Sequence, residues 1–327
     1  GVTYVIGFRG YGSRFTKGKV YISKDITATY GSAMPSNAVP TQAGYTFEGY
    51  YTAQNGNGTK YYNSDMSSAN NWNIAGATTL YANWTAHVYT VILNKQSSVL
   101  SGTDSVEVTY GSPMPSAEAP TRNNYIFQGY FAETDGAGKQ YYDGQMNSIN
   151  DWDVADGGTI FAYWLGNPYT VTFDKQGGSG GTTSITARYG AAMPTATAPT
   201  RTNYVLVGYF DEPNGAGSKY YDGPNMVSVK NWNKTEDTTL YAYWRGVYYT
   251  ISYQNLTFME KTAEVIWDNT TLQDAPTYYE YGKGLDLSRA SAFWQTSSPY
   301  TSQLVFLGWY TDMTFTTPVT SISTSKT

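Results

Sequence analysis

The sequence has no cysteine, a single histidine and few charged residues, which make up 14% of its 327 positions. Without cysteine the chain forms no disulfide bond and has no thiolate chemistry. No apolar run approaches the roughly 18 residues of a membrane-spanning helix, so we expect no membrane insertion in this segment. The formal net charge of −5 supplies no basic field, so we expect no nucleic-acid partner.

The one histidine, His87, lies in a short segment between two repeated stretches. A catalytic triad or a zinc site needs several partner side chains, and no such set recurs along the chain. A pair of glycosidase carboxylates would need one unique cleft, which an array of similar units does not offer. We therefore expect a solvated linker residue at His87, and no enzyme activity, metal or cofactor in the chain.

Aromatic residues and glycine are abundant. Aromatics make up 17% of the chain, which contains 33 tyrosines and 33 glycines. Aromatic side chains suit the half-buried surface of a sheet, and glycine suits the turns between strands. Disordered chains, in contrast, have few aromatics. The composition predicts a mostly β protein.

Three similar stretches follow one another along the chain. Each closes with an aliphatic residue, an aromatic residue, alanine, a variable residue and tryptophan, and the closing tryptophans Trp84, Trp164 and Trp244 lie 80 residues apart. Each also contains a Tyr-Gly-x-x-Met-Pro segment, followed by a segment with Gly before two aromatics. These are Tyr30–Pro35, Tyr110–Pro115 and Tyr189–Pro194, then Tyr45–Tyr51, Tyr125–Phe131 and Tyr204–Phe210. Tandem duplication predicts repeated small domains.

We place the four predicted repeats at residues 1–85, 86–166, 167–246 and 247–327. The first has a longer hairpin around 9–19. The fourth diverges: it has insertions around 256–276 and 288–302, a looser copy of the glycine-containing strand at 304–310, and no closing strand before Thr327. Only four residues separate a closing tryptophan from the next opening tyrosine. Such short linkers restrict the orientation of neighbouring domains, so we expect an elongated rod.

Each repeat is expected to contain four strands whose side chains alternate between two faces. In the glycine-containing strand, Tyr45, Phe47 and Gly49 would then face the core. In the closing strand, leucine, alanine and tryptophan would share the core face, which predicts Trp84, Trp164 and Trp244 as core residues. The same alternation places five tyrosines on the opposite face of these strands. They are Tyr50, Tyr130, Tyr209, Tyr163 and Tyr243.

These five tyrosines are the strongest candidates for ligand binding, because tyrosine offers amphipathic contact area at a low entropy cost. The competing interpretation, which we favour, is that the rings cover the second face of the sheet or a contact between repeats. Under the binding interpretation the ligand would be a surface glycan or a host protein.

Other polar patterns have simpler interpretations. The turns that begin at Asn55, Asp135 and Asn214 superficially resemble calcium loops, but two of the three lack the carboxylate, so we interpret them as turn residues. Lys95 and Lys175 could suggest a lysine–asparagine crosslink. Asn83 occurs only in the repeat without such a lysine, so we reject the crosslink.

The order and spacing of these motifs resemble the Listeria–Bacteroides repeat family, the B-repeats of internalin-type bacterial surface proteins. Gly308-Trp-Tyr-Thr-Asp in the fourth repeat is similar to the commoner form of that family's motif. The resemblance covers nearly the whole chain. It implies small β-grasp-like domains on the bacterial cell surface that do no catalysis.

Two functions follow from this resemblance and from the tyrosine pattern. The first is an extracellular stalk or spacer of an adhesin-like protein, with the chain as a monomer. The second is a multivalent module that binds carbohydrate or host protein through repeated tyrosines. Loss of a saturable ligand in Tyr130→Ala would favour the second.

Overall fold

The computed structural model describes residues 3–10, 25–96, 101–253, 258–259, 266–267, 270–273, 275–287, 291–294, 308–310 and 317–324. These residues form two units, Gly1–Leu165 and Gly166–Thr327, which are described separately. The predicted long hairpin of the first repeat, most of both insertions in the fourth and much of its 304–310 segment lie outside the described residues.

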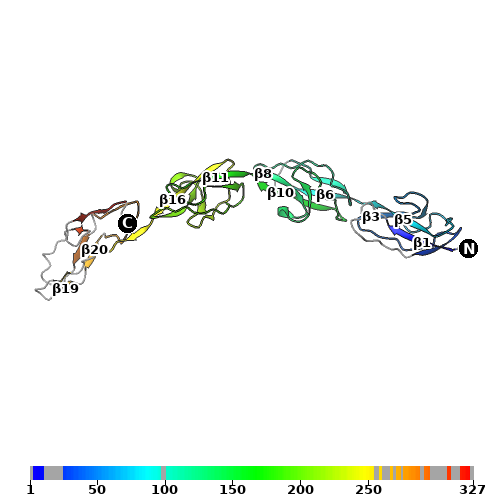
Figure 1. Ribbon diagram of the computed structural model, residues 1–327, viewed down its shortest axis with the longest axis horizontal. Helices are drawn as coiled ribbons and strands as arrows, with labels where there is room; N and C mark the ends of the chain where they lie inside the picture. The colour runs from blue at the N-terminus through cyan, green and yellow to red at the C-terminus, as the bar shows by residue number, and fades with distance from the viewer. Residues whose placement is uncertain are drawn as a thin grey trace. The chain divides into compact units, whose positions relative to one another are not determined.

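The first unit begins with a five-stranded sheet in the order β2-β1-β5-β3-β4. The opening strand β1 pairs in parallel with the closing strand β5, and the other pairings are antiparallel. Figure 1 shows β1, β3 and β5 together near the N-terminus. The strands are β1 (Thr3–Gly10), β2 (Ile26–Thr29), β3 (Tyr45–Tyr51), β4 (Lys60–Tyr62) and β5 (Thr78–Ala86).

The second sheet of this unit repeats that order as β7-β6-β10-β8-β9. Its strands are β6 (Val88–Asn94), β7 (Ser105–Thr109), β8 (Tyr125–Phe131), β9 (Gln140–Asp143) and β10 (Gly158–Gly166), with a short 3-10 turn η1 (Thr134–Gly136) after β8. The linker between the two sheets is a single residue, His87, because β5 ends at Ala86 and β6 begins at Val88.

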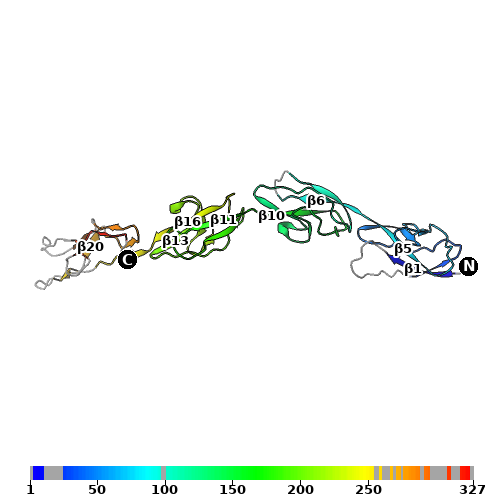
Figure 2. The same cartoon turned by 45° about the horizontal axis from the view of Figure 1, so that its top comes forward.

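The second unit starts with the same arrangement, extended by one strand to β12-β11-β16-β13-β14-β15. Figure 2 shows β11, β13 and β16 side by side, as their hydrogen-bonded registers require. The elements are β11 (Pro168–Asp174), β12 (Ser184–Arg188), β13 (Tyr204–Phe210), η2 (Pro213–Gly215), β14 (Lys219–Asp222), β15 (Val227–Ser228) and β16 (Thr238–Gly246).

The rest of the second unit contains short antiparallel pairs: β17 with β21, β18 with β19, β20 with β23, β22 with β26, and β24 with β25. Their bounds are β17 (Tyr248–Thr250), β18 (Phe258–Met259), β19 (Ile266–Trp267), β20 (Thr270–Gln273), β21 (Tyr278–Glu280), β22 (Leu285–Asp286), β23 (Ser291–Trp294), β24 (Trp309–Tyr310), β25 (Pro318–Val319) and β26 (Ser321–Ile322).

The prediction of a mostly β protein is confirmed, but the predicted count of four strands per repeat is wrong. The fifth strand, which is β4 in the first sheet, contains a pair of adjacent tyrosines, Tyr61 and Tyr62. It pairs antiparallel with the edge of the glycine-containing strand, where Tyr50 lies opposite Tyr62. Two adjacent tyrosines favour this extended backbone, which alternates them between the two sides of the strand.

Each of the three larger sheets carries a core of aliphatic and aromatic side chains. In the third, Phe173 packs its ring against Tyr209 at 4.7 Å and Tyr221 at 5.7 Å between centroids. A buried aromatic side chain removes about 150–250 Å² from water, so these rings dominate the stabilisation of a small domain. The residues at these positions are Phe8, Tyr50, Tyr62 and Leu80 in the first sheet, Leu93, Tyr130, Tyr142 and Ile160 in the second, and Phe173, Tyr209, Tyr221 and Leu240 in the third.

A β-bulge in the glycine-containing strand reverses the predicted orientation of the next tyrosine. The register between β13 and β16 shifts between Leu206 and Gly208, and Gly208 has φ +154°. The bulge adds a residue to one strand, so both Leu206 and Tyr209 face the core. Glycine is required here because a Cβ would lie 2.3 Å from the carbonyl oxygen of Tyr221.

The predicted exposure of Tyr50, Tyr130 and Tyr209 is therefore wrong. Their side chains are 6%, 0% and 0% exposed, and each belongs to the core of its sheet. The same bulge occurs in the first sheet, where the register shifts between Phe47 and Gly49. The alternation that we applied to the whole strand stops at the bulge.

Candidate functional site

The two remaining candidate tyrosines, Tyr163 and Tyr243, lie on the second face of their sheets. Tyr163 is half-buried, and Tyr243 is 39% exposed. Each ring meets an aromatic residue edge-on, Phe131 at 5.9 Å and Phe210 at 6.0 Å. This geometry supports the interpretation that the rings cover the second face, and it leaves part of Tyr243 accessible.

A loop glycine packs directly on each of these rings. A Cβ on Gly136 or Gly215 would lie 2.8 Å from the ring of Tyr163 or Tyr243. The residues before these glycines, Asp135 and Asn214, have φ near +60°, as turn residues do. Our interpretation of these segments as turns is therefore supported.

The strand tryptophans are partly buried at the margin of the core. Trp84, Trp164 and Trp244 pack against the core clusters, and the indole Nε1 of Trp164 donates a hydrogen bond of 3.0 Å to the Lys95 carbonyl. Trp244 makes the matching bond to Lys175 at 2.9 Å. These tryptophans thus serve as packing residues, as predicted, but each is only partly buried.

The most deeply buried tryptophans come instead from a loop that sequence analysis did not assign to the core. Trp72, Trp152 and Trp232 are 0%, 2% and 0% exposed. Each ring packs against the first tyrosine of the fifth-strand pair, as Trp232 does against Tyr220 at 5.2 Å. The adjacent Tyr-Tyr pair was the sequence signal for this burial. Neighbouring residues of a strand point to opposite sides, so both tyrosines are buried only if other residues cover both sides of the strand.

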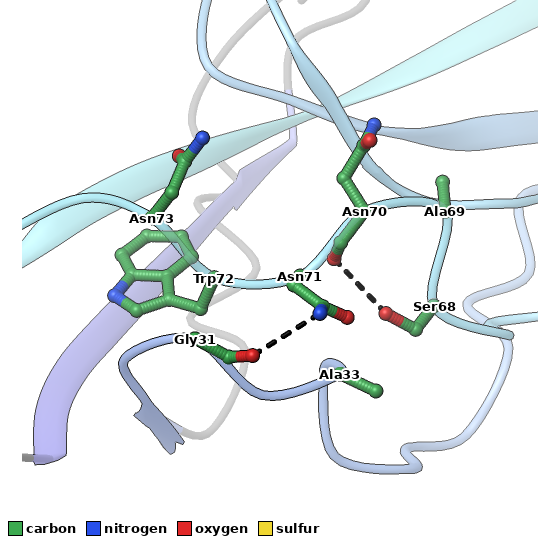
Figure 3. Close-up of a pocket in the computed structure, with 8 residues that line it drawn as sticks. All are labelled: Gly31, Ala33, Ser68, Ala69, Asn70, Asn71, Trp72 and Asn73. Atoms are coloured by element: carbon green, nitrogen blue, oxygen red, sulfur yellow. Dashed lines mark hydrogen bonds between the residues drawn. The ribbon is translucent and has the colours of Figure 1, made fainter. Parts of the chain in front are cut away.

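In the first sheet this loop borders a pocket of ≈ 560 Å³, shown in Figure 3. The polar groups lining it hold the loop in place: Asn71 Nδ2 donates to the Gly31 carbonyl at 3.1 Å, and Ser68 Oγ donates to the Asn70 carbonyl at 3.0 Å. The first contact recurs in the third repeat, where Asn231 Nδ2 donates to the Gly190 carbonyl at 2.9 Å. The amides at this pocket therefore have a structural role. The pocket residues are Gly31, Ala33, Ser68, Ala69, Asn70, Asn71, Trp72 and Asn73.

The prediction that His87 is a solvated linker residue is wrong. Its ring is half-buried, and its two nitrogens lie 2.7 Å from Thr46 Oγ1 and 3.1 Å from the Tyr89 hydroxyl oxygen. Its backbone also connects the two repeats: the His87 N–H donates to the Gly44 carbonyl, and its carbonyl accepts from the Tyr110 N–H. His87 is thus part of a packed joint between neighbouring repeats.

The second unit contains the same joint with different side chains. Val247 replaces His87, donating its N–H to the Asn203 carbonyl and accepting from the Tyr281 N–H. The Tyr249 hydroxyl donates directly to Asn203 Oδ1 at 3.0 Å. In the first unit the residue equivalent to Asn203 is Gly44, which has no side chain to accept a bond from Tyr89. The His87 ring lies against the Tyr89 hydroxyl instead.

Two tyrosines meet edge-on across both joints. Tyr45 and Tyr110 have ring centroids 5.4 Å apart, and Tyr204 and Tyr281 have theirs 5.3 Å apart. In the first joint, a Cβ at Gly44 would lie 2.6 Å from the Tyr110 ring, so glycine permits this contact.

Two further charged residues, Lys95 and Asp143, have local partners. Lys95 Nζ forms an ion pair of 2.6 Å with Asp104, and Asp143 accepts backbone N–H groups of its own turn. Within the described parts of the chain, no group of three or more histidine and acidic residues could hold a metal ion. No helix among the described residues has the length and apolar character needed to span a bilayer.

Three segments of the chain, residues 4–83, 89–154 and 169–243, match the model of the Listeria-Bacteroides repeat domain and together cover more than half of it. The chain belongs to the Listeria-Bacteroides repeat domain family. The assignment made from the motifs is confirmed, and each matched segment falls on one of the three larger sheets.

Relatives of this repeat chain include proteins from two organisms. A protein of Evansella cellulosilytica, named provisionally as a Gly-rich membrane protein, is 23% identical over 81% of this chain and 28% of its own length. A second protein from that organism, named provisionally as a membrane protein, is 24% identical over 70% of this chain and 31% of its own length. Internalin H of Listeria monocytogenes is 31% identical over 38% of this chain and 21% of its own length. The chain thus spans less than a third of each of these relatives.

Proposed function

We propose that this chain is a non-catalytic spacer in a bacterial cell-surface protein, an elongated, monomeric array of small β-grasp-like domains held outside the cell. The main support for the proposal is that one core arrangement, and one kind of joint between repeats, recur along the chain. Equivalent aliphatic and aromatic positions build the core of each larger sheet, and both joints use the same backbone hydrogen bonds. Repetition of scaffold residues, without a repeated reactive group, is typical of a structural array.

The joints support the spacer function because they limit rotation between neighbouring repeats. A one-residue linker that donates to one repeat and accepts from the next has few accessible conformations. The edge-on tyrosine pair adds an aromatic contact on each joint. The names of the relatives, a membrane protein and an internalin, are consistent with a location on the cell surface.

Surface display of arrays of different length tests this function. The chain is placed between a membrane anchor and a terminal epitope, with two, three or four repeats retained, and the height of the epitope above the membrane is measured. Each added repeat is expected to raise the epitope by on the order of 30 Å, the diameter of an 80-residue domain. A Gly/Ser linker with the same number of residues is the control. An epitope height that does not depend on repeat number would contradict the proposal.

The second candidate, a multivalent binding module, is favoured by one observation, the partial exposure of Tyr243. Tyr50, Tyr130 and Tyr209 are buried and offer no surface to a ligand. Any such binding would therefore be concentrated where aromatic rings reach the surface, rather than repeated equally in every domain.

A further inference from the structure

The joint between the third and fourth repeats carries exposed aromatic rings beside two cations. Tyr248 on β17 and Tyr278 on β21 are 49% and 59% exposed, and their rings meet edge-on at 5.4 Å. The Arg245 guanidinium lies 5.3 Å from the centroid of the Tyr248 ring. Large aromatic rings at the surface are unusual unless they cover another group or receive a ligand.

Lys283 adds a second cation, through its ion pair with the residue opposite Tyr248 in the register. Its side chain is 71% exposed and forms an ion pair of 2.8 Å with Glu280. We call this set the aromatic–basic patch: Arg245, Tyr248, Tyr278 and Lys283.

The acidic residue at the patch is turned inward. The Glu280 side chain is 10% exposed, and its Oε1 accepts a hydrogen bond of 3.2 Å from the Gly246 N–H. Burial alone would raise the pKa of Glu280, but the contacts with Lys283 and Gly246 and the charge of Arg245 hold that pKa below its usual value. Glu280 therefore stays ionised and holds Lys283, while Arg245 and Lys283 present positive charge to solvent.

The same positions in the first unit provide an internal comparison. In the register of β6 with β7, Val88 and Glu107 occupy the places that Tyr248 and Tyr278 occupy in β17 and β21. Thr85 occupies the place of Arg245. Both joints have the same backbone, so the aromatic and basic side chains are a property of the second joint and are not needed to build a joint.

We propose that the aromatic–basic patch binds an acidic saccharide through Tyr248, Tyr278 and Arg245. A sugar ring has an apolar face that packs on a tyrosine ring, and its hydroxyl groups remain in water. A carboxylate on that sugar would pair with the Arg245 guanidinium, which binds carboxylates through two parallel hydrogen bonds. Tyr and Arg are also among the residues that most often dominate binding at protein–protein interfaces.

A saccharide fits this patch better than an acidic peptide. An acidic peptide would use the charge or a strand edge and would gain little from the tyrosines, whereas this patch places exposed rings beside a guanidinium. The exposed rings carry apolar area with no need for a deep groove. The spacer function does not use this patch, so a failure of this proposal leaves the spacer proposal unchanged.

Calorimetric titration of the whole 327-residue chain tests the inference. The probes are a hyaluronan hexasaccharide, which carries uronic acid carboxylates, the neutral chitin hexasaccharide, and hexaglutamate. We expect only the hyaluronan fragment to bind, and Tyr278→Ala and Arg245→Ala each to weaken it by about tenfold or more. Tyr278→Phe keeps the ring and is expected to bind nearly as the unchanged chain does.

A gain of binding provides the matched control. Replacing Thr85, Val88 and Glu107 by Arg, Tyr and Tyr transfers the patch to the first joint and is expected to raise the stoichiometry from one site to two. The proposal is overturned by equal binding of hexaglutamate or of the neutral hexasaccharide. It is equally overturned by hyaluronan binding that survives both alanine variants, or by a dissociation constant weaker than roughly 10 mM.

Discussion

The two faces of the third sheet give tyrosine opposite roles. Tyr209 on β13 is fully buried, whereas Tyr243 on the adjacent strand β16 is 39% exposed, although it lies directly opposite Gly208 in the register. The bulge at Gly208 turns Tyr209 toward the core and leaves Tyr243 on the second face. One glycine therefore decides which of two neighbouring tyrosines stabilises the domain and which can meet a ligand.

The largest effect is expected from alkaline pH, which acts on every core at once. Burial raises the pKa of four core tyrosines to about 12: Tyr62, Tyr142, Tyr209 and Tyr221. In the unfolded chain each phenol loses its proton near pH ~10, whereas the folded chain retains it. Stability from these residues is therefore complete below pH ~10 and is lost as the pH rises toward 12.

Tyrosinate absorbance and near-ultraviolet circular dichroism, followed together from neutral to strongly alkaline pH, check this prediction. The core phenols should ionise in the same transition in which the aromatic dichroism disappears. Ionisation of every tyrosine near its ordinary pKa, with the aromatic dichroism intact, would show that the core rings are accessible to solvent.

Removing the loop tryptophan should be among the most costly single substitutions. Trp232 is fully buried against Tyr220, so Trp232→Ala leaves a large cavity and should lower the free energy of unfolding of the third repeat by about 3–5 kcal/mol. Trp244→Ala is the matched control at a partly buried position, with an expected loss of about 2 kcal/mol. Hydrogen exchange in peptides of residues 204–246 measures both. Equal losses would contradict the assignment of Trp232 to the core.

Gly208→Ala tests the bulge itself. The new Cβ would lie 2.3 Å from the Tyr221 carbonyl oxygen, and the positive φ disfavours alanine, so we expect a loss of about 2–4 kcal/mol. Gly180→Ala has the positive φ but meets no atom within 4 Å, and is expected to cost about 1 kcal/mol. If the two variants proved equally stable by hydrogen exchange in their respective peptides, the close approach at the bulge would be absent.

The smallest effect is expected on the second face. Tyr243→Ala removes one edge-on contact with Phe210 and a contact with Gly215 from a partly exposed ring, so it should cost less than about 1 kcal/mol. Tyr209→Ala, compared by hydrogen exchange in the same peptides, should cost about 3–5 kcal/mol. A ranking in which Tyr243 matters more than Tyr209 would reverse the assignment of the two faces.

The repeats, the mostly β fold and the core positions of the opening and closing strands were predictable from sequence. Val171 and Phe173 alternate as a strand does, and both are buried. The orientation of Tyr209 was not predictable from that period, because a glycine within a strand does not show whether the strand continues or bulges. The pattern up to Leu206 is the same in both cases.

The remaining errors concern groups whose neighbours are distant in sequence. Trp232 is buried because its loop folds over Tyr220, and His87 is half-buried because Thr46, 41 residues earlier, lies against its ring. The aromatic–basic patch depends on the pairing of Tyr248 with Glu280, across a segment with no counterpart in the other repeats. Local periodicity does not contain these contacts.

Small-angle scattering of the whole chain tests the spacer account most directly. Four domains joined in an elongated array, roughly 100 Å or more from end to end, predict a radius of gyration of about 30 Å or above. A single compact body of 327 residues would have a radius of gyration of about 20 Å. A value near 30 Å, with a maximum dimension of at least ~100 Å, is the result that we expect. A value near 20 Å would contradict the spacer function.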